Sequence, residues 1–262
     1  MKVSKIKTVI ILALVVLNVF FLTFLTFERS KEHSVNKQAF SEISSIYENS
    51  GVRLVLKSLP TEEQVSYYTF STASEELKIV KYFLGDAERQ GNIYSSALGN
   101  VSADQQLTMD IALFNYTADS NYEKTVRTIL NNLSIEDYEI NTEAQNITAR
   151  RRLNGKNVVN GDIRFSFAAN QLENVSGFVY NEFTGQKSEK SVVMKPITAA
   201  VDFLNCINDK TVSCSSVTSF EVAYYLRTNI RSEYMLYPCW EIDTDTGVYY
   251  LDGDTGKLLY IS

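Results

Sequence analysis

The stretch CWEIDTDTGVYYLDGDTGKLLYIS, residues 239–262, decides how the C-terminal part of the chain folds. Two clusters of aspartate, threonine and glycine flank its apolar run. A calcium-binding EF-hand loop beginning at Asp243 would need an oxygen ligand at its fifth position, which is Gly247, and a glutamate at its twelfth, which is Asp254. Aspartate and glycine suit hairpin turns instead, because aspartate bonds to the backbone ahead and glycine adopts positive φ. We therefore expect turns of a small antiparallel sheet and no metal site.

The remainder of residues 51–262 alternates strand patterns with helix patterns. The order of strands, helix and strands in each half predicts an α+β fold of two antiparallel-sheet-plus-helix subdomains. The charged run Arg150-Arg151-Arg152, with NGKN after it, indicates a turn, so we expect extracytoplasmic domains at 51–149 and 150–262. The expected strands are 52–56, 65–70, 106–116, 138–148, 158–168, 175–183, 217–226, 240–242, 248–251 and 258–261, and the expected helices are 74–84, 122–133 and 196–207.

The N-terminal segment 9–27 is apolar and carries no charge. Its length of about 19 residues would span about 28 Å as a helix, close to the thickness of a bilayer core. The apolar run exceeds that of a signal peptide, and no small-residue cleavage site follows it. We therefore expect an uncleaved transmembrane helix at 9–27. Basic residues in 1–8 put that segment in the cytoplasm, which predicts a single-pass protein of the cell membrane with its C-terminal domain extracytoplasmic.

Asn18 lies at the centre of this apolar segment. At helical spacing it shares one stripe with apolar residues that would face a partner span. Either Asn18 is a tolerated amide, or it hydrogen-bonds a partner helix; the sequence leaves both readings open. Apolar residues at helical spacing also predict a helical stalk over 28–50. The candidate contact stripe in the membrane is Ile11, Leu14, Asn18, Phe21, Leu22 and Leu25.

The residues that catalysis usually requires are sparse. The single histidine is His33, beside the membrane segment, which argues against histidine-activated nucleophiles and histidine zinc sites in the main body. No P-loop or dinucleotide-binding motif occurs, and a net charge of −6 does not favour nucleic acid. We expect no enzyme activity, catalytic residue, cofactor or metal. Cys206 and Cys214 are spaced for a disulfide that would leave Cys239 unpaired, and three reduced thiols are the alternative.

Three parts of the chain resemble the YycI/YycH family of membrane-anchored regulators. They are the basic start with KTVIILALVVLNVFF, the segment GVRLVLKSLP after the stalk, and NGKNVVNGDIRFSF leading to GFVY. The similarity spans nearly the full chain and is greatest to YycI. In addition, Pro238-Cys239-Trp240 followed by VYYLDGDTGKLL resembles the closing hairpin of PepSY-like domains.

The resemblance implies a membrane-anchored accessory regulator of a cell-envelope two-component sensor histidine kinase. It implies that kinase and a second YycH-like anchored protein as partners, contacted through the ectodomain and the membrane helix. The alternative is a PepSY-like binding module for a peptide, a protease or a cell-wall polymer. A groove near Trp240 would be the expected ectodomain contact in that case.

Overall fold

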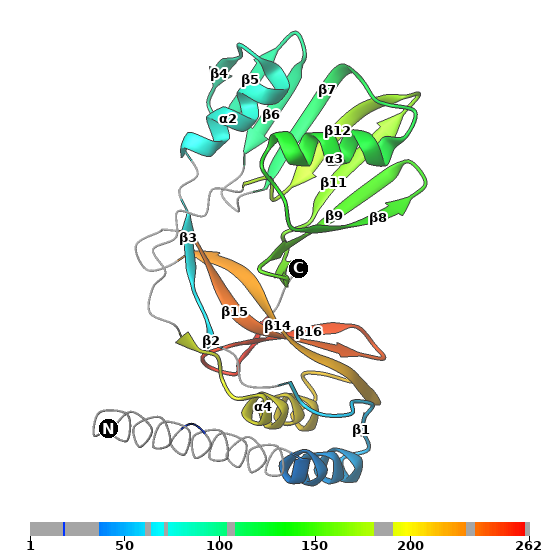
Figure 1. Ribbon diagram of the computed structural model, residues 1–262, viewed down its shortest axis with the longest axis vertical. Helices are drawn as coiled ribbons and strands as arrows, with labels where there is room; N and C mark the ends of the chain where they lie inside the picture. Colours follow the sequence, from blue (N-terminus) through cyan, green and yellow to red (C-terminus); the bar gives the residue numbers. More distant parts are fainter. Residues whose placement is uncertain are drawn as a thin grey trace, which may run out of the picture.

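The computed structural model describes residue 18 and residues 37–60, 64–70, 73–103, 108–180, 191–228 and 234–259. Within these residues, fifteen strands form one mixed sheet that runs through two regions, an upper and a lower one as drawn in Figure 1. The strand order is β17-β16-β15-β14-β10-β9-β11-β12-β7-β6-β5-β4, with β1 beside β14, β3 beside β15 and β8 beside β9. A separate two-stranded pair joins β2 (Gln64–Val65) and β13 (Ser191–Val192).

The upper region is antiparallel throughout its described strands. Helix α2 (Ala73–Leu84) packs on β5 and β6, and α3 (Tyr122–Asn132) contacts β9. The side chain of Asn121 caps α3 by accepting a hydrogen bond from the Lys124 N–H. The strands are β4 (Glu88–Gln90), β5 (Ile93–Ser96), β6 (Gly99–Ala103), β7 (Met109–Thr117), β8 (Tyr138–Glu143), β9 (Asn146–Leu153), β11 (Ile163–Ala168) and β12 (Gln171–Gly177).

The lower region is built on the long hairpin of β14 (Ser216–Thr228) and β15 (Tyr234–Thr244), continued by β16 (Val248–Asp252) and β17 (Leu258–Leu259). Strand β3 (Tyr68–Phe70) pairs with β15, whereas β1 (Arg53–Leu54) and β10 (Lys156–Val159) pair with β14 in parallel. Helix α4 (Pro196–Asn208) begins with a proline at its first turn, where the missing N–H costs nothing. Its Phe203 packs edge-on against Phe220 of β14, with ring centroids 6.1 Å apart.

The expectation of an α+β protein with two antiparallel subdomains was wrong. The described structure is mostly one large mixed sheet with few helices. The sequence 158–168 reads as one strand, but a tight turn at Asn160 and Gly161 divides it, and Asn160 has a φ of +56°. Strand β10 then crosses to the lower region and β11 stays in the upper one, so the sheet continues from one region into the other. The expected boundary between 149 and 150 falls inside β9.

The run of three arginines is also not a turn. It belongs to β9, where successive side chains point to opposite faces. Arg151 is 2% exposed, whereas its two neighbours lie on the opposite face. The turn lies just beyond, at Asn154 and Gly155, which both have positive φ.

The two aspartate-rich turns of the C-terminal meander are confirmed. In the second, a carboxylate oxygen of Asp252 accepts hydrogen bonds from the N–H groups of Asp254 and Thr255, at 3.1 and 2.9 Å. Gly256 then adopts a φ of +67°, which a side chain would disfavour. The aspartate therefore orders its own turn, as the pattern predicts.

The expected membrane helix and most of the expected stalk lie outside the described residues. No helix within the described parts of the chain is long and apolar enough to cross a bilayer. The described end of the stalk, helix 37–49, is packed on the body beside α4 rather than standing free (Figure 1). Tyr47 is fully buried there, and its hydroxyl donates to the carbonyl oxygen of Ala200 over 2.6 Å.

Candidate functional site: a charged cleft where the two regions meet

A cleft of about 700 Å³ lies where β10 crosses from the upper to the lower region. Its upper wall comes from β7, β9, β11 and β12, and its lower wall comes from β14, β15 and β16. The charged residues that line it are Asp110, Arg150, Asp162 and Arg164 on the upper side and Arg227 and Glu241 on the lower side. Volumes of 300–1,000 Å³ are usual for small-ligand sites, so this cleft has the size of a binding site.

Strand alternation and register assemble the upper wall. Ile163 and Phe165 of β11 point into the core, so Arg164 between them points outward. The register pairs Arg164 with Ser176 of β12, and Ser176 with Asp110 of β7. A transverse row of three polar side chains therefore crosses three strands and lines the cleft.

The charges on the upper wall alternate in sign. Arg150 Nε lies 3.8 Å from Asp162 Oδ1, a long ion pair between side chains that are both partly exposed. Burial raises the pKa of Asp162, against the opposing effect of Arg150 and Arg164. Arg164 itself forms no ion pair with any described residue.

The lower wall holds a carboxylate without a cation. Asn157 Nδ2 donates to both carboxylate oxygens of Glu241, at 3.1 and 3.3 Å, but no ion pair involves Glu241 within the described parts of the chain. Burial is the main cause that raises its pKa, and the carboxylates of Asp243 and Glu221 raise it further. The amide of Asn157 and the charge of Arg150 lower the pKa of Glu241 in opposition, so burial of this carboxylate is only partly offset.

The same amide connects the two regions. Asn157 Oδ1 accepts from Arg152 Nε at 3.3 Å, and Arg152 Nη2 donates to Glu139 at 2.9 Å. The chain of contacts runs from β8 through β9 and β10 to Glu241 on β15. Glu241 is therefore linked through Asn157 to β10, the strand that crosses between the two regions.

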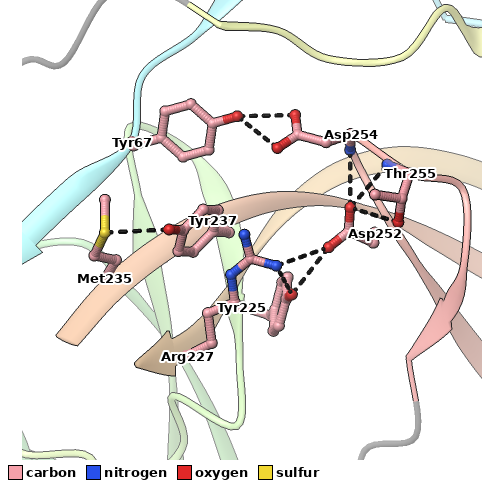
Figure 2. Close-up of polar contacts among 8 residues, drawn as sticks. All are labelled: Tyr67, Tyr225, Arg227, Met235, Tyr237, Asp252, Asp254 and Thr255. Carbon is pink, nitrogen blue, oxygen red and sulfur yellow. Dashed lines mark hydrogen bonds and ion pairs between the residues drawn. The ribbon is translucent and has the colours of Figure 1, made fainter. Parts of the chain in front are cut away.

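Arg227 of the lower wall is held by two tyrosines and a carboxylate (Figure 2). The Arg227 guanidinium lies 3.4 Å from the ring centroid of Tyr237, a close cation–π contact. Its Nη1 donates to Asp252 at 3.1 Å and to the hydroxyl of Tyr225 at 3.0 Å. Asp252 orders the second turn of the meander, so Arg227 ties that turn to β14.

A second contact ties the turn to the N-terminal half of the chain. The Tyr67 hydroxyl donates to the carboxylate of Asp254 at 2.8 Å, and its ring lies edge-on to Tyr237, with centroids 5.0 Å apart (Figure 2). Through the ring of Tyr237, these contacts help to hold Arg227 in place on the lower wall.

The charged groups of the cleft can form charge-assisted hydrogen bonds. Neither wall contains a histidine or a cysteine among its lining residues. Within the described parts of the chain, no three His, Cys, Asp or Glu side chains gather as a metal site. Three guanidinium groups and three carboxylates instead offer charge-assisted hydrogen bonds, which are stronger than neutral ones.

Of the contact residues that the sequence predicts, the two that the structure describes, Asn18 and Trp240, do not line the cleft. Asn18 is helical and exposed, and the other five residues of its stripe, Ile11, Leu14, Phe21, Leu22 and Leu25, fall outside the described residues. Trp240 is 1% exposed, and its Nε1 donates to the carbonyl oxygen of Met194 at 3.2 Å, so its indole is core rather than surface. Cys206 and Cys214 are free, half-buried thiols, and burial raises the pKa of both.

Sequence reasoning did not find Asn157, Arg164 or Glu241. The one local signal was strand alternation, which places Arg164 opposite to the buried Ile163 and Phe165. Their convergence depends on β10 pairing in parallel with β14, a contact between residues about seventy positions apart. No local pattern contains that information.

Comparisons with known proteins give structural neighbours of weak identity. No family model and no curated protein matches the chain. An uncharacterized protein from Eubacterium rectale is similar at 7% identity over 80% of this chain and 90% of that chain, with a TM-score of 0.43. The C-terminal domain of Bacillus megaterium YpeB is similar at 11% identity over 74% of this chain and 98% of that chain, with a TM-score of 0.37. Likenesses of this strength assign the chain to no family.

Proposed function

We propose that this protein is a non-enzymatic accessory regulator, held at the cell membrane by its apolar segment 9–27, that acts on a sensor histidine kinase of the cell envelope. The kinase, and a second anchored protein of the same family, are partners implied by the resemblance to YycI. Regulation of this kind requires only that the protein contact two states of the kinase with different affinities.

The docking of helix 37–49 on the body is the observation that most supports this proposal. Tyr47 is buried against α4 and donates to Ala200, and Ile43 on the same face is 5% exposed. A helix fixed in this way moves with the body. A tilt of the body would therefore also move residue 37, the end of this helix that is nearer to the apolar segment in the sequence.

Kinase activity in reconstituted membranes tests the regulator. The full-length protein is extracted with the kinase that co-purifies with it, both are placed in lipid vesicles, and autophosphorylation is measured with and without the protein. We expect the protein to change the rate, and Tyr47→Ala to reduce that change. Ile46→Ala is the matched control, because Ile46 lies on the same helix but is 50% exposed. If adding the protein leaves the autophosphorylation rate unchanged, the proposal that it regulates the kinase is wrong.

The charged cleft favours a second candidate, an extracytoplasmic binding module for a peptide or another charged polymer. Its size and its fixed, mixed-sign walls support this candidate. Purification of the intact protein from membranes distinguishes the two candidate functions. Co-purification with a kinase supports the regulator, and retention of a soluble ligand supports the binding module.

A further inference from the structure

The charges that line the cleft compensate one another. Three arginines and three carboxylates lie along its walls, so the lining carries no net charge. Arg150 and Arg164 both face Asp162, and Arg150 also faces Glu241 from the opposite wall. Arg227 donates to a carboxylate of its own region at 3.1 Å. A ligand therefore meets little unbalanced charge, and the walls do not select for a charged one.

The walls offer hydrogen-bonding groups of both kinds instead. Guanidinium groups only donate, carboxylates only accept, and amides do both. The neutral polar side chains of Asn157, Asn160 and Ser176 line the cleft together with the charged ones. A hydroxyl group donates one hydrogen bond and accepts others, so a ligand with many hydroxyls can bond to every kind of wall group without carrying a charge. Sugars are ligands of this description.

Glu241 and Tyr250 form the part of the lower wall that suits a sugar best. The register places them opposite each other on β15 and β16, so their side chains share one face of the sheet. Asn157 Nδ2 donates to both carboxylate oxygens of Glu241, at 3.1 and 3.3 Å, which orients this acceptor. The tyrosine beside it combines an apolar ring with a hydroxyl tip, as a sugar combines C–H faces with hydroxyl groups.

Groups on both walls are partly withdrawn from water. Burial raises the pKa of Asp162 on the upper wall and of Glu241 and Tyr250 on the lower wall. Titratable groups with shifted pKa values that line one cleft indicate a functional site. Hydrogen bonds to charged groups are also stronger than those to neutral groups, so a ligand gains most where it touches both walls.

We propose that this cleft binds an uncharged oligosaccharide, whose hydroxyl groups bond to Glu241 and Arg150 and whose ring packs on Tyr250. The cleft volume of about 700 Å³ accommodates a short oligosaccharide. This inference rests on the second candidate function in placing the ligand in the cleft, and it changes the ligand from a charged polymer to an uncharged one. It does not depend on the kinase.

Calorimetry with the full-length protein, in a detergent that has no sugar headgroup, tests the proposal. The probes are three neutral tetrasaccharides, chitotetraose, cellotetraose and maltotetraose, with tetragalacturonate as an acidic comparison and the glucosamine tetramer as a basic one. We expect at least one neutral probe to bind about tenfold more tightly than either charged probe. Its dissociation constant should change less than about twofold between about 0.05 and 0.5 M salt, because salt screens charged ligands. Tighter binding of a charged probe, or no binding of any neutral probe, would overturn the proposal.

Two variants assign the binding to the cleft. Glu241→Gln can still accept from Asn157, but it replaces a charged acceptor by a neutral one, and we expect about a tenfold loss of affinity for the neutral probe. Tyr250→Leu removes the ring and is expected to weaken binding by a similar factor. Arg127→Gln is the control, because Arg127 pairs with Glu123 on the surface of α3, outside the cleft. If both cleft variants bind like the wild type, the sugar binds elsewhere and the assignment is wrong.

The outcome is distinguishable from those of both candidate functions. Binding of a charged peptide, without binding of a neutral sugar, would keep the binding module and remove only this inference. Sugar binding in a protein that has no effect on kinase autophosphorylation would keep this inference and remove the regulator.

Discussion

Arg151 donates from Nη1 to the carbonyl oxygen of Tyr180 over 3.1 Å, inside the core of the protein. The same nitrogen lies 3.5 Å from the carbonyl oxygen of Phe178, and the guanidinium lies over the ring of Phe178. Burial lowers the pKa of Arg151 to about 10, so the side chain remains charged at neutral pH. The buried cation therefore fixes the chain that leaves β12.

Replacement of Arg151 is expected to be strongly destabilising. Arg151→Met would remove the hydrogen bonds to two carbonyl oxygens and the cation that Glu75 and Asp137 face. Removal of one partner from such a buried arrangement costs about 3–5 kcal/mol. Urea unfolding measures the loss, and Arg152→Met is the control, expected to cost about 1 kcal/mol or less because its ion pair is exposed. Equal losses in the two variants would contradict the structural role of Arg151.

Glu241 is expected to make stability fall as pH rises. Its pKa is raised in the folded protein, so the folded state binds the proton more tightly than the unfolded state does. Its contribution is fully present below the unfolded pKa of 4.5 and is lost as pH rises through the folded pKa. Glu241→Gln is therefore expected to be more stable than the wild type at pH 7 and equal to it near pH 4. Thermal unfolding across this range checks the sign.

Asp245 is expected to act in the opposite direction and at lower pH. Its carboxylate accepts from the Ser215 hydroxyl and from the N–H groups of Ser215 and Ser216, and these bonds lower its pKa to about 2. Its stabilisation is present above the unfolded pKa of 3.8 and is lost as pH falls toward 2. Asp245→Asn should remove this loss. If acid unfolding curves of variant and wild type run parallel from pH 4 to pH 2, the carboxylate does not stabilise the fold.

Trp240 provides an internal probe, because it is the single tryptophan of the chain. Since the indole is 1% exposed, its emission should be at short wavelength in the folded protein and resist quenching by acrylamide. Unfolding should move the emission to longer wavelength. Ready quenching in the native protein would contradict the buried position and restore Trp240 as a surface contact.

The sequence was sufficient where local rules decide the structure. Helical spacing located α2, α3 and α4 to within one or two residues, and Asp-Gly chemistry located the turns of the C-terminal meander. Asn160 and Gly161 are turn residues as well, yet they lie between two apolar runs that join into one plausible strand. Because these two residues were read as part of a strand, the predicted architecture was wrong: it missed the pairing of β10 with β14.

The arginine run shows a different limit. Three adjacent charges are usually a solvated surface, but in a strand only alternate residues share a face. Arg151 therefore points inward while Arg150 lines the cleft and Arg152 bonds to Asn157. The cleft draws on eight strands that lie between β7 and β16 in the sequence. Single charged residues on separate strands carry no local signal that they will meet.

The pairing of β1 with β14, and of β3 with β15, bears on the order in which the protein assembles. Arg53 meets Ser216, and Tyr68 meets Leu236, so these contacts close loops of more than 160 residues. Such long-range pairings form slowly, because the chain loses loop entropy before it gains contacts. During synthesis, the antiparallel upper region is complete once β12 has emerged, whereas the lower region waits for β15. The upper region is therefore available to fold first, and the cleft comes into existence only when the second region closes beneath it.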